Sequence, residues 1–278
     1  MDNKALKTSL IVSAVCLVIA LIALSAVTYA WFTFDPYTNV TPMEGRISKG
    51  DANLLISDKP TSGFGKSCRL VPEHMGQALY PVSTETLDKF FAAVYQEEGV
   101  SKRFTELTRD SGWDPSDYLI HGKVYLKATG GGTNVYFDRP PLDFGTNAQW
   151  LAAGRLGLKI TGADNKTAVF IFNLDDMGNT AGAEEKATID PPAGQRDKAL
   201  VIRSVDAQGI PGFAEDPAQS LNPCILGNTG AKPLLSLKAE EVATVEYWLY
   251  LEGCDVNCIN PVQSKDITLQ FGFAGNAA

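Results

Sequence analysis

Histidine is scarce in this chain, which contains only His74 and His121. A zinc peptidase needs two histidines on one helix face with a glutamate beside them, and no HExxH pattern occurs. His121 lies in a strand pattern and His74 in a proline-flanked loop. No Gly-x-Ser-x-Gly motif, phosphate loop or dinucleotide fingerprint is present either. The sequence therefore predicts no catalytic residue, no metal ligand and no cofactor. Two carboxylates brought together from distant strands, as in a glycosidase, remain an enzymatic alternative.

An excess of basic residues is also missing, because 24 lysines and arginines face 32 acidic residues and the net charge is -8. An acidic surface argues against nucleic acid and anionic lipid headgroups as partners. Beyond the first segment the chain has no run of like charge, heptad pattern, low-complexity tract or repeat. These properties suit a soluble extracellular protein.

The first 30 residues contain the one long apolar run. No charged residue occurs from Thr8 to Phe34, and two lysines precede the run. Small residues before Trp31 match the site that a signal peptidase reads, so we expect an export signal cleaved between Ala30 and Trp31. The alternative is a retained anchor, with residues 8–30 spanning a bilayer. Either reading places the rest of the chain outside the cytoplasm, secreted or at the cell surface.

Five cysteines are present, and one of them, Cys16, lies within the apolar run. The exported part keeps Cys68, Cys224, Cys254 and Cys258. Four cysteines in an oxidising compartment allow two disulfides in three possible pairings. A zinc site at the Cys254-x3-Cys258 spacing and free thiols are the alternatives.

Alternation of apolar and polar residues predicts an all-β fold. Strands are expected at 118–128, 133–138, 155–161, 167–173, 199–205, 244–251 and 267–273. We expect hairpins over 46–57, 118–138 and 155–173, and pairing of the last two strands. One helix is expected at 85–97, because Ser83-Thr84-Glu85 can cap apolar residues at helical spacing. The prediction is a jelly-roll-type antiparallel β-sandwich over 44–278, with a helical and loop insertion at about 58–117.

One face of the strand at 244–251 carries Glu246, Trp248 and Tyr250. Such a face could bind a glycan or a partner protein through its aromatic rings. The alternative is that the helical insertion covers it.

Three stretches resemble the TasA/camelysin family of exported Gram-positive surface and biofilm-matrix proteins. They are the Ala30-Trp31-Phe32 junction, the segment Glu44-Gly45-Arg46-Ile47 with residues 53–57, and residues 266–273, DITLQFGF. The resemblance implies a jelly-roll subunit that assembles into fibres, with the freed N-terminal segment inserted as a strand into the next subunit. Relatives of the camelysin type have been described as metalloproteases, a role that the missing HExxH disfavours here. The four exported cysteines and the expected helix depart from the family pattern.

The residues offer a physical basis for strand donation. In an extended segment Phe32 and Phe34 share one face, while Trp31 and Thr33 share the other. Such a segment, 31–43, could add to an open sheet edge through backbone hydrogen bonds. The alternative is a linker, or an edge strand of its own domain. We therefore expect a non-enzymatic fibre subunit whose partners are itself, a signal peptidase and other matrix components. A monomeric surface binding module is the second hypothesis.

Overall fold

The computed structural model describes residues 43–47, 53–72, 79–94, 103–108, 117–143, 148–174, 199–255, 257–258 and 270–278. All of them belong to one compact unit, Tyr37–Ala278. These ranges are mostly β-strand with one short α-helix, α2 (Ala148–Ala153), which confirms the all-β class. In this part of the chain no helix is long and apolar enough to cross a bilayer. The expected export segment, the Ala30 cleavage site, the assembly strand at 31–34 and His74 lie outside the described residues.

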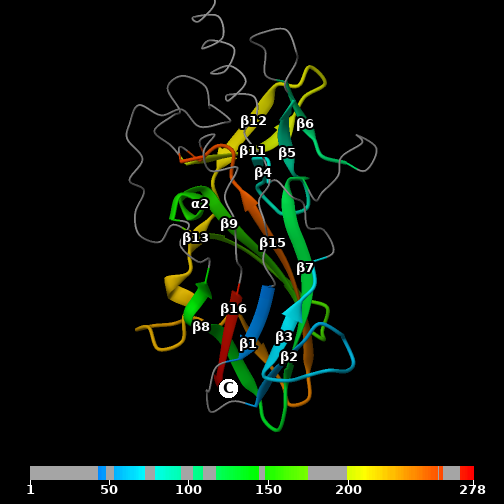
Figure 1. Cartoon of the computed structure of the whole chain (residues 1–278), viewed down its shortest axis with the longest axis vertical. Helices are drawn as coiled ribbons and strands as arrows, with labels where there is room; N and C mark the ends of the chain where they lie inside the picture. Colours follow the sequence, from blue (N-terminus) through cyan, green and yellow to red (C-terminus); the bar gives the residue numbers. More distant parts are fainter. Residues whose placement is uncertain are drawn as a thin grey trace, which may run out of the picture. The chain divides into compact units, whose positions relative to one another are not determined.

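Two large sheets form the body of the unit (Figure 1). One has the strand order β14-β8-β16-β1-β3, and the other has the order β13-β10-β9-β15-β7-β2. The bounds in the first sheet are β14 Leu235–Leu237, β8 Thr133–Asp143, β16 Gln270–Ala277, β1 Met43–Ile47 and β3 Ser67–Leu70. Those in the second are β13 Gln219–Ser220, β10 Thr167–Asn173, β9 Gly154–Thr161, β15 Val242–Leu251, β7 Leu119–Ala128 and β2 Leu54–Ser57.

The sheets face each other across one apolar core. Alternate residues of β15, such as Val245, Tyr247 and Leu249, are buried in it together with Phe137 of β8 and Phe273 of β16. This alternation is the reason why the sequence pattern located these strands correctly. The body is therefore a two-layer β-sandwich, and its pairings are antiparallel except for β1 with β16 and β10 with β13.

Three of the four expected strand pairings are wrong. Only the hairpin over 155–173 forms, as β9 and β10. The strands β7 and β8 belong to different sheets, as do β15 and β16, and β1 and β2. The segment after β7, with Gly130 at a φ of +88°, carries the chain from one sheet to the other. Alternation identifies a strand but contains no information on which sheet it joins, so a crossing between sheets looked like a hairpin turn.

The expected helix at 85–97 is also wrong for the residues described, 85–94. Thr84 Oγ1 accepts a hydrogen bond from the Leu87 amide at 3.0 Å, but the chain then turns, with Leu87 at a φ of +63°. Residues Phe91–Val94 form strand β5. Phe90 and Phe91 point into two different apolar clusters, as neighbours in an extended chain must. Helical spacing of the apolar residues was therefore produced by a turn followed by a strand.

A smaller outer layer covers part of the six-stranded sheet. It consists of β4 (Val82–Ser83), β5 and β6 (Arg103–Glu106) in one sheet, and of β11 (Leu200–Val205) and β12 (Pro211–Glu215) in another. These elements occupy the upper part of Figure 1. Val82, Leu87 and Phe90 pack there against Tyr250 of β15 and Ile171 of β10. The stretch 58–117, expected as a helical and loop insertion, thus contains β3 and most of this layer.

Candidate functional site

The two long sides of the sandwich are built differently, and this difference defines the candidate site. On one side β2 and β3 are the edge strands, and the chain between them closes the gap. Ile56 and Gly65 exchange backbone hydrogen bonds of 2.8 and 3.0 Å. Lys66 Nζ also donates to the Leu54 carbonyl at 3.0 Å. On this side the described chain therefore bonds to the edge strand β2 itself.

The other side is closed over only part of its length. Strand β13 pairs with Phe172 and Asn173 at the end of β10, and the following residues cross to the facing sheet. There the Leu226 amide donates to the Phe137 carbonyl at 3.0 Å. The Leu234 amide donates to the Val135 carbonyl at 2.7 Å, just before β14 begins. The crossing segment leaves the first residues of β10 uncovered.

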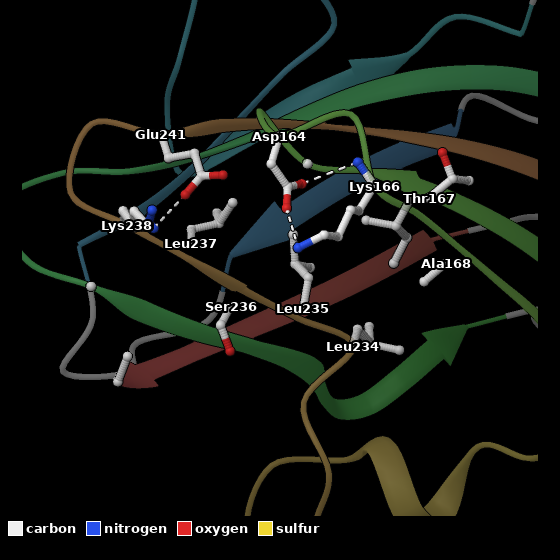
Figure 2. Close-up of a pocket in the computed structure, with 14 residues that line it drawn as sticks. Asp164, Lys166, Thr167, Ala168, Leu234, Leu235, Ser236, Leu237, Lys238 and Glu241 are labelled. Atoms are coloured by element: carbon white, nitrogen blue, oxygen red, sulfur yellow. Dashed lines mark hydrogen bonds and ion pairs between the residues drawn. The ribbon is translucent and has the colours of Figure 1, made fainter.

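A groove of about 510 Å³ lies at this uncovered part, between β10 and β14 (Figure 2). In the described part of the chain, no strand pairs with residues 167–171 of β10 on the side away from β9, or with β14 on the side away from β8. Both sheets thus present an edge to the groove. A sheet edge carries backbone N–H and C=O groups that a further strand can use.

The groove has an apolar floor and a charged rim. Ile160, Leu234 and Leu237 form the floor and are nearly fully buried, and the exposed Ala168 lines one wall. At the rim the Lys166 amide and Nζ bind the Asp164 carboxylate at 3.1 and 3.0 Å. The hydrogen bond from Lys166 is the main reason why the pKa of Asp164 is lowered. Across the rim, Glu241 accepts hydrogen bonds from the Lys238 amide at 2.7 Å and the Ala163 amide at 3.2 Å.

These contacts determine what the groove can bind. Both rim carboxylates are already bonded to groups of neighbouring turns, so the floor and the sheet edges remain as the binding elements. An extended peptide with apolar side chains on one face matches this combination, because edge pairing supplies affinity and apolar pockets supply register. No set of three His, Cys, Asp or Glu side chains among the described residues is placed to hold a metal ion.

The aromatic face expected from the sequence is only partly open. Tyr250 is fully buried under Phe90, whose ring meets it edge-on at 5.6 Å between centroids. Trp248 is half-buried and stacks on His121 at 4.8 Å. Glu246, also half-buried, lies 3.6 Å from His121 Nε2. The outer layer thus covers the Tyr250 end of the face, and it does so with β-strands and turns instead of a helix.

Cys68, Cys224, Cys254 and Cys258 form no disulfide in the structure. Cys224 and Cys258 belong to the main core, Cys68 packs against it, and Cys254 lies in the outer layer's apolar cluster. Burial raises the pKa of Cys68 to about 11 and that of Cys254 still further. Among the described residues, Cys254 and Cys258 belong to no set of three side chains placed to hold a metal ion.

Sequence reasoning missed both the groove and a buried group of charges. Arg155 Nη2 donates to Asp216 at 2.9 Å and to Asp255 at 2.7 Å, and Glu252 lies nearby. The only available signal was periodicity: Glu252 continues the face of Trp248 and Tyr250, so a covered Tyr250 implies a covered Glu252. Nothing local predicted the groove, because it is formed by two strand edges far apart in the sequence.

Comparison with protein-family models, curated proteins and solved structures finds no match for this chain.

Proposed function

We propose that this protein is an exported structural subunit of a bacterial cell-surface or biofilm-matrix fibre, with a sandwich of jelly-roll type. The groove between β10 and β14 accepts an extended strand donated by residues 31–34 of another copy. The observation that carries the proposal is the groove itself. It is an apolar slot between two sheet edges that no strand of the described chain pairs with, in a sandwich whose opposite edge strands are joined by the Ile56–Gly65 bridge.

The direction of the strands favours assembly between copies. The chain enters β1 at Met43, beside Gln270 at the start of β16, because the two strands run parallel. The groove lies near Ala278 and Gly132, beyond the other end of β16. Eight residues of strand separate these two ends by about 25 Å. A segment leaving one end of a subunit and binding at the opposite end of the next makes a head-to-tail contact, which generates an open filament when the rotation between subunits does not close a ring.

The chemistry of the proposed donor suits the groove. Phe32 and Phe34 would face the floor formed by Ile160, Leu234 and Leu237. The donor backbone would pair with an edge of the groove, which β10 provides over 167–171. The side chains of residues 31–34 carry no charge, so none of them competes for the paired carboxylates at the rim, and the α-amino group of Trp31 is the one charge that the donor brings.

The first test compares protein that begins at Trp31 with protein that begins at Asp35. Electron microscopy of both at high concentration should reveal filaments only for the longer form. When the full chain is secreted from a Gram-positive host, the mature protein should have Trp31 as its N-terminal residue. Filaments from the shorter form, monomers only from the longer form, or an intact apolar segment would contradict the proposal.

The second test blocks the groove. Ala168→Arg places a long charged side chain in the groove and should prevent filaments. The matched control is Val169→Arg, because Val169 is 46% exposed on the same strand, points to the other face and does not line the groove. A mixture of the A168R protein, which can only donate, with the form beginning at Asp35, which can only accept, should stop at dimers. Filaments from the A168R protein alone would exclude this groove as the acceptor.

A further inference from the structure

A network of buried charges lies where the outer layer meets the end of β15. Arg155, 3% exposed, bonds to Asp216 after β12 and to Asp255 after β15. Its Nη1 donates to the carbonyl of Gly154 and to Asn173 at the end of β10. The network thus joins β9, β10, the segment after β12 and the turn after β15. All of these meet at the contact of Val82 and Ser83 of β4 with residues 252 and 253, which we call the seam.

Glu252 is the most deeply buried acid of this seam, at 1% exposure. One carboxylate oxygen, Oε1, accepts from the Cys254 amide at 3.2 Å, and Ser83 of β4 is close enough to the carboxyl group to lower its pKa slightly. The other oxygen, Oε2, has no partner among the described residues. An ionised carboxylate in this position would have one oxygen without solvation, and burial disfavours the charged form strongly.

The backbone around Glu252 forms the seam itself. Glu252 forms an isolated parallel β-bridge with Val82 of β4, and the Gly253 amide donates a hydrogen bond to the Val82 carbonyl at 2.7 Å. Ser83 Oγ accepts from the Ile202 amide of β11 at 2.8 Å. Val82 and Ser83 belong to the outer layer, so the contacts at Glu252 and Gly253 attach the layer to the end of β15, beside the packing of Phe90 on Tyr250.

We propose that Glu252 is a pH-sensitive latch for the outer layer: its carboxyl group is neutral while the layer is closed on β15, and its ionisation loosens this seam. The latch is independent of the proposed assembly through the groove. It requires no change in the core between the two large sheets.

The direction follows from the charges around the group. Burial, and then the negative charge of Asp216, raise the pKa of Glu252 from 4.5 to about 8, while Arg155 opposes the shift. The groups that surround it are, from the elements packed around the seam, Ser83 of β4, Arg155 of β9, Asp216 after β12, Tyr250 of β15, and Cys254 and Asp255 in the following turn. Of the charged residues, one is basic and two are acidic, so ionised Glu252 adds a third negative charge to a single arginine.

The raised pKa fixes the pH range of the effect. In the closed state Glu252 keeps its proton up to about pH 8, whereas in an opened, hydrated seam its pKa returns to about 4.5. The closed seam is therefore fully stable below pH 4.5 and loses stability as the pH rises toward 8. Between these values the ratio of open to closed seam increases about tenfold per pH unit, and it levels off above pH 8.

Hydrogen exchange measured by NMR tests the latch. The Ile202 and Gly253 amides report on the seam, and amides between β7 and β15 report on the sandwich. Protection factors, which remove the intrinsic pH dependence of exchange, should fall about 100- to 1,000-fold at the seam between pH 5 and pH 8. They should stay constant in Glu252→Gln, which keeps an oxygen acceptor for the Cys254 amide. The matched control Glu246→Gln, a half-buried acid of β15 away from the seam, should behave like wild type.

Three outcomes would overturn the latch: seam protection in wild type that does not change over this range, an unchanged pH dependence in E252Q, or a fall of the β7–β15 amides as large as that of the seam. If E252Q does not fold, a carbon-13 titration of the Glu252 carboxyl in wild type decides the matter. A midpoint near 4.5 would rule the latch out, and a midpoint near 8 would support it.

Discussion

Replacing Arg155 with methionine should lower the free energy of unfolding by about 3–5 kcal/mol. Arg155 Nη2 contacts the carboxylates of Asp216 and Asp255, whose side chains are only 8% and 10% exposed. Two exposed ion pairs would together contribute at most about 2 kcal/mol. The larger expected loss arises because methionine leaves two buried carboxylates without their counter-ion. The loss of unfolding free energy in this variant therefore measures directly whether the two carboxylates are buried in solution.

Urea unfolding at pH 7, followed by tryptophan fluorescence, measures this loss. The matched control is Lys159→Met, because Lys159 lies on the same strand but forms a half-exposed pair with Asp88 at 3.2 Å. That substitution should cost less than about 1 kcal/mol. The triple variant Arg155→Met, Asp216→Asn, Asp255→Asn should recover much of the loss, since it removes the orphaned charges. A loss below about 1 kcal/mol for R155M, or no recovery in the triple variant, would refute the reasoning.

Other buried groups give sharper tests of single contacts. Tyr250→Phe should stabilise the protein by about 1–3 kcal/mol in urea unfolding, because the Tyr250 hydroxyl is buried without a hydrogen-bond partner in the described chain; a loss of stability would mean that the hydroxyl is bonded. Gly122→Ala should cost about 1–3 kcal/mol, since a Cβ there overlaps the ring of Tyr247, whereas Gly131→Ala, with nothing nearby, should change stability by less than about 0.5 kcal/mol. Thiol reagents at pH 8 should label Cys68 and Cys254 far more slowly in native than in urea-unfolded protein, because burial raises both pKa values; equal rates would place these thiols at the surface.

The sequence predicted the strands that are half-buried in one regular layer. Residues 244–251 alternate because Val245, Tyr247 and Leu249 face the core while Glu246 and Trp248 face outward. The hairpin of β9 and β10 was predicted because its turn is short and its two strands are adjacent in the sequence. Local pattern is sufficient in these places, since one face of the strand is apolar and the other is not.

Features made by distant residues were not predictable in this way. The turn at Leu87 depends on Gly157, over which the Leu87 side chain packs. The strand at Phe91 depends on Ile202, which shares an apolar cluster with Phe91. In the sequence, Arg155 looks like an ordinary polar residue of a strand. Its buried ion pairs with Asp216 and Asp255 appear only when the chain is folded. The groove depends on where a crossing segment ends, which tertiary packing decides and local propensity does not.

The pairing of β1 with β16 has a consequence for how the chain folds. These two strands, the first and the last of the described chain, lie side by side inside one sheet, with β3 and β8 on their outer flanks. The sheet therefore lacks its middle until residues 270–277 have been synthesised. Contacts between such distant segments slow folding. Under the proposed export, this delay would keep the chain unfolded for passage through a membrane channel, because the sheet can close only after residues 270–277 are available.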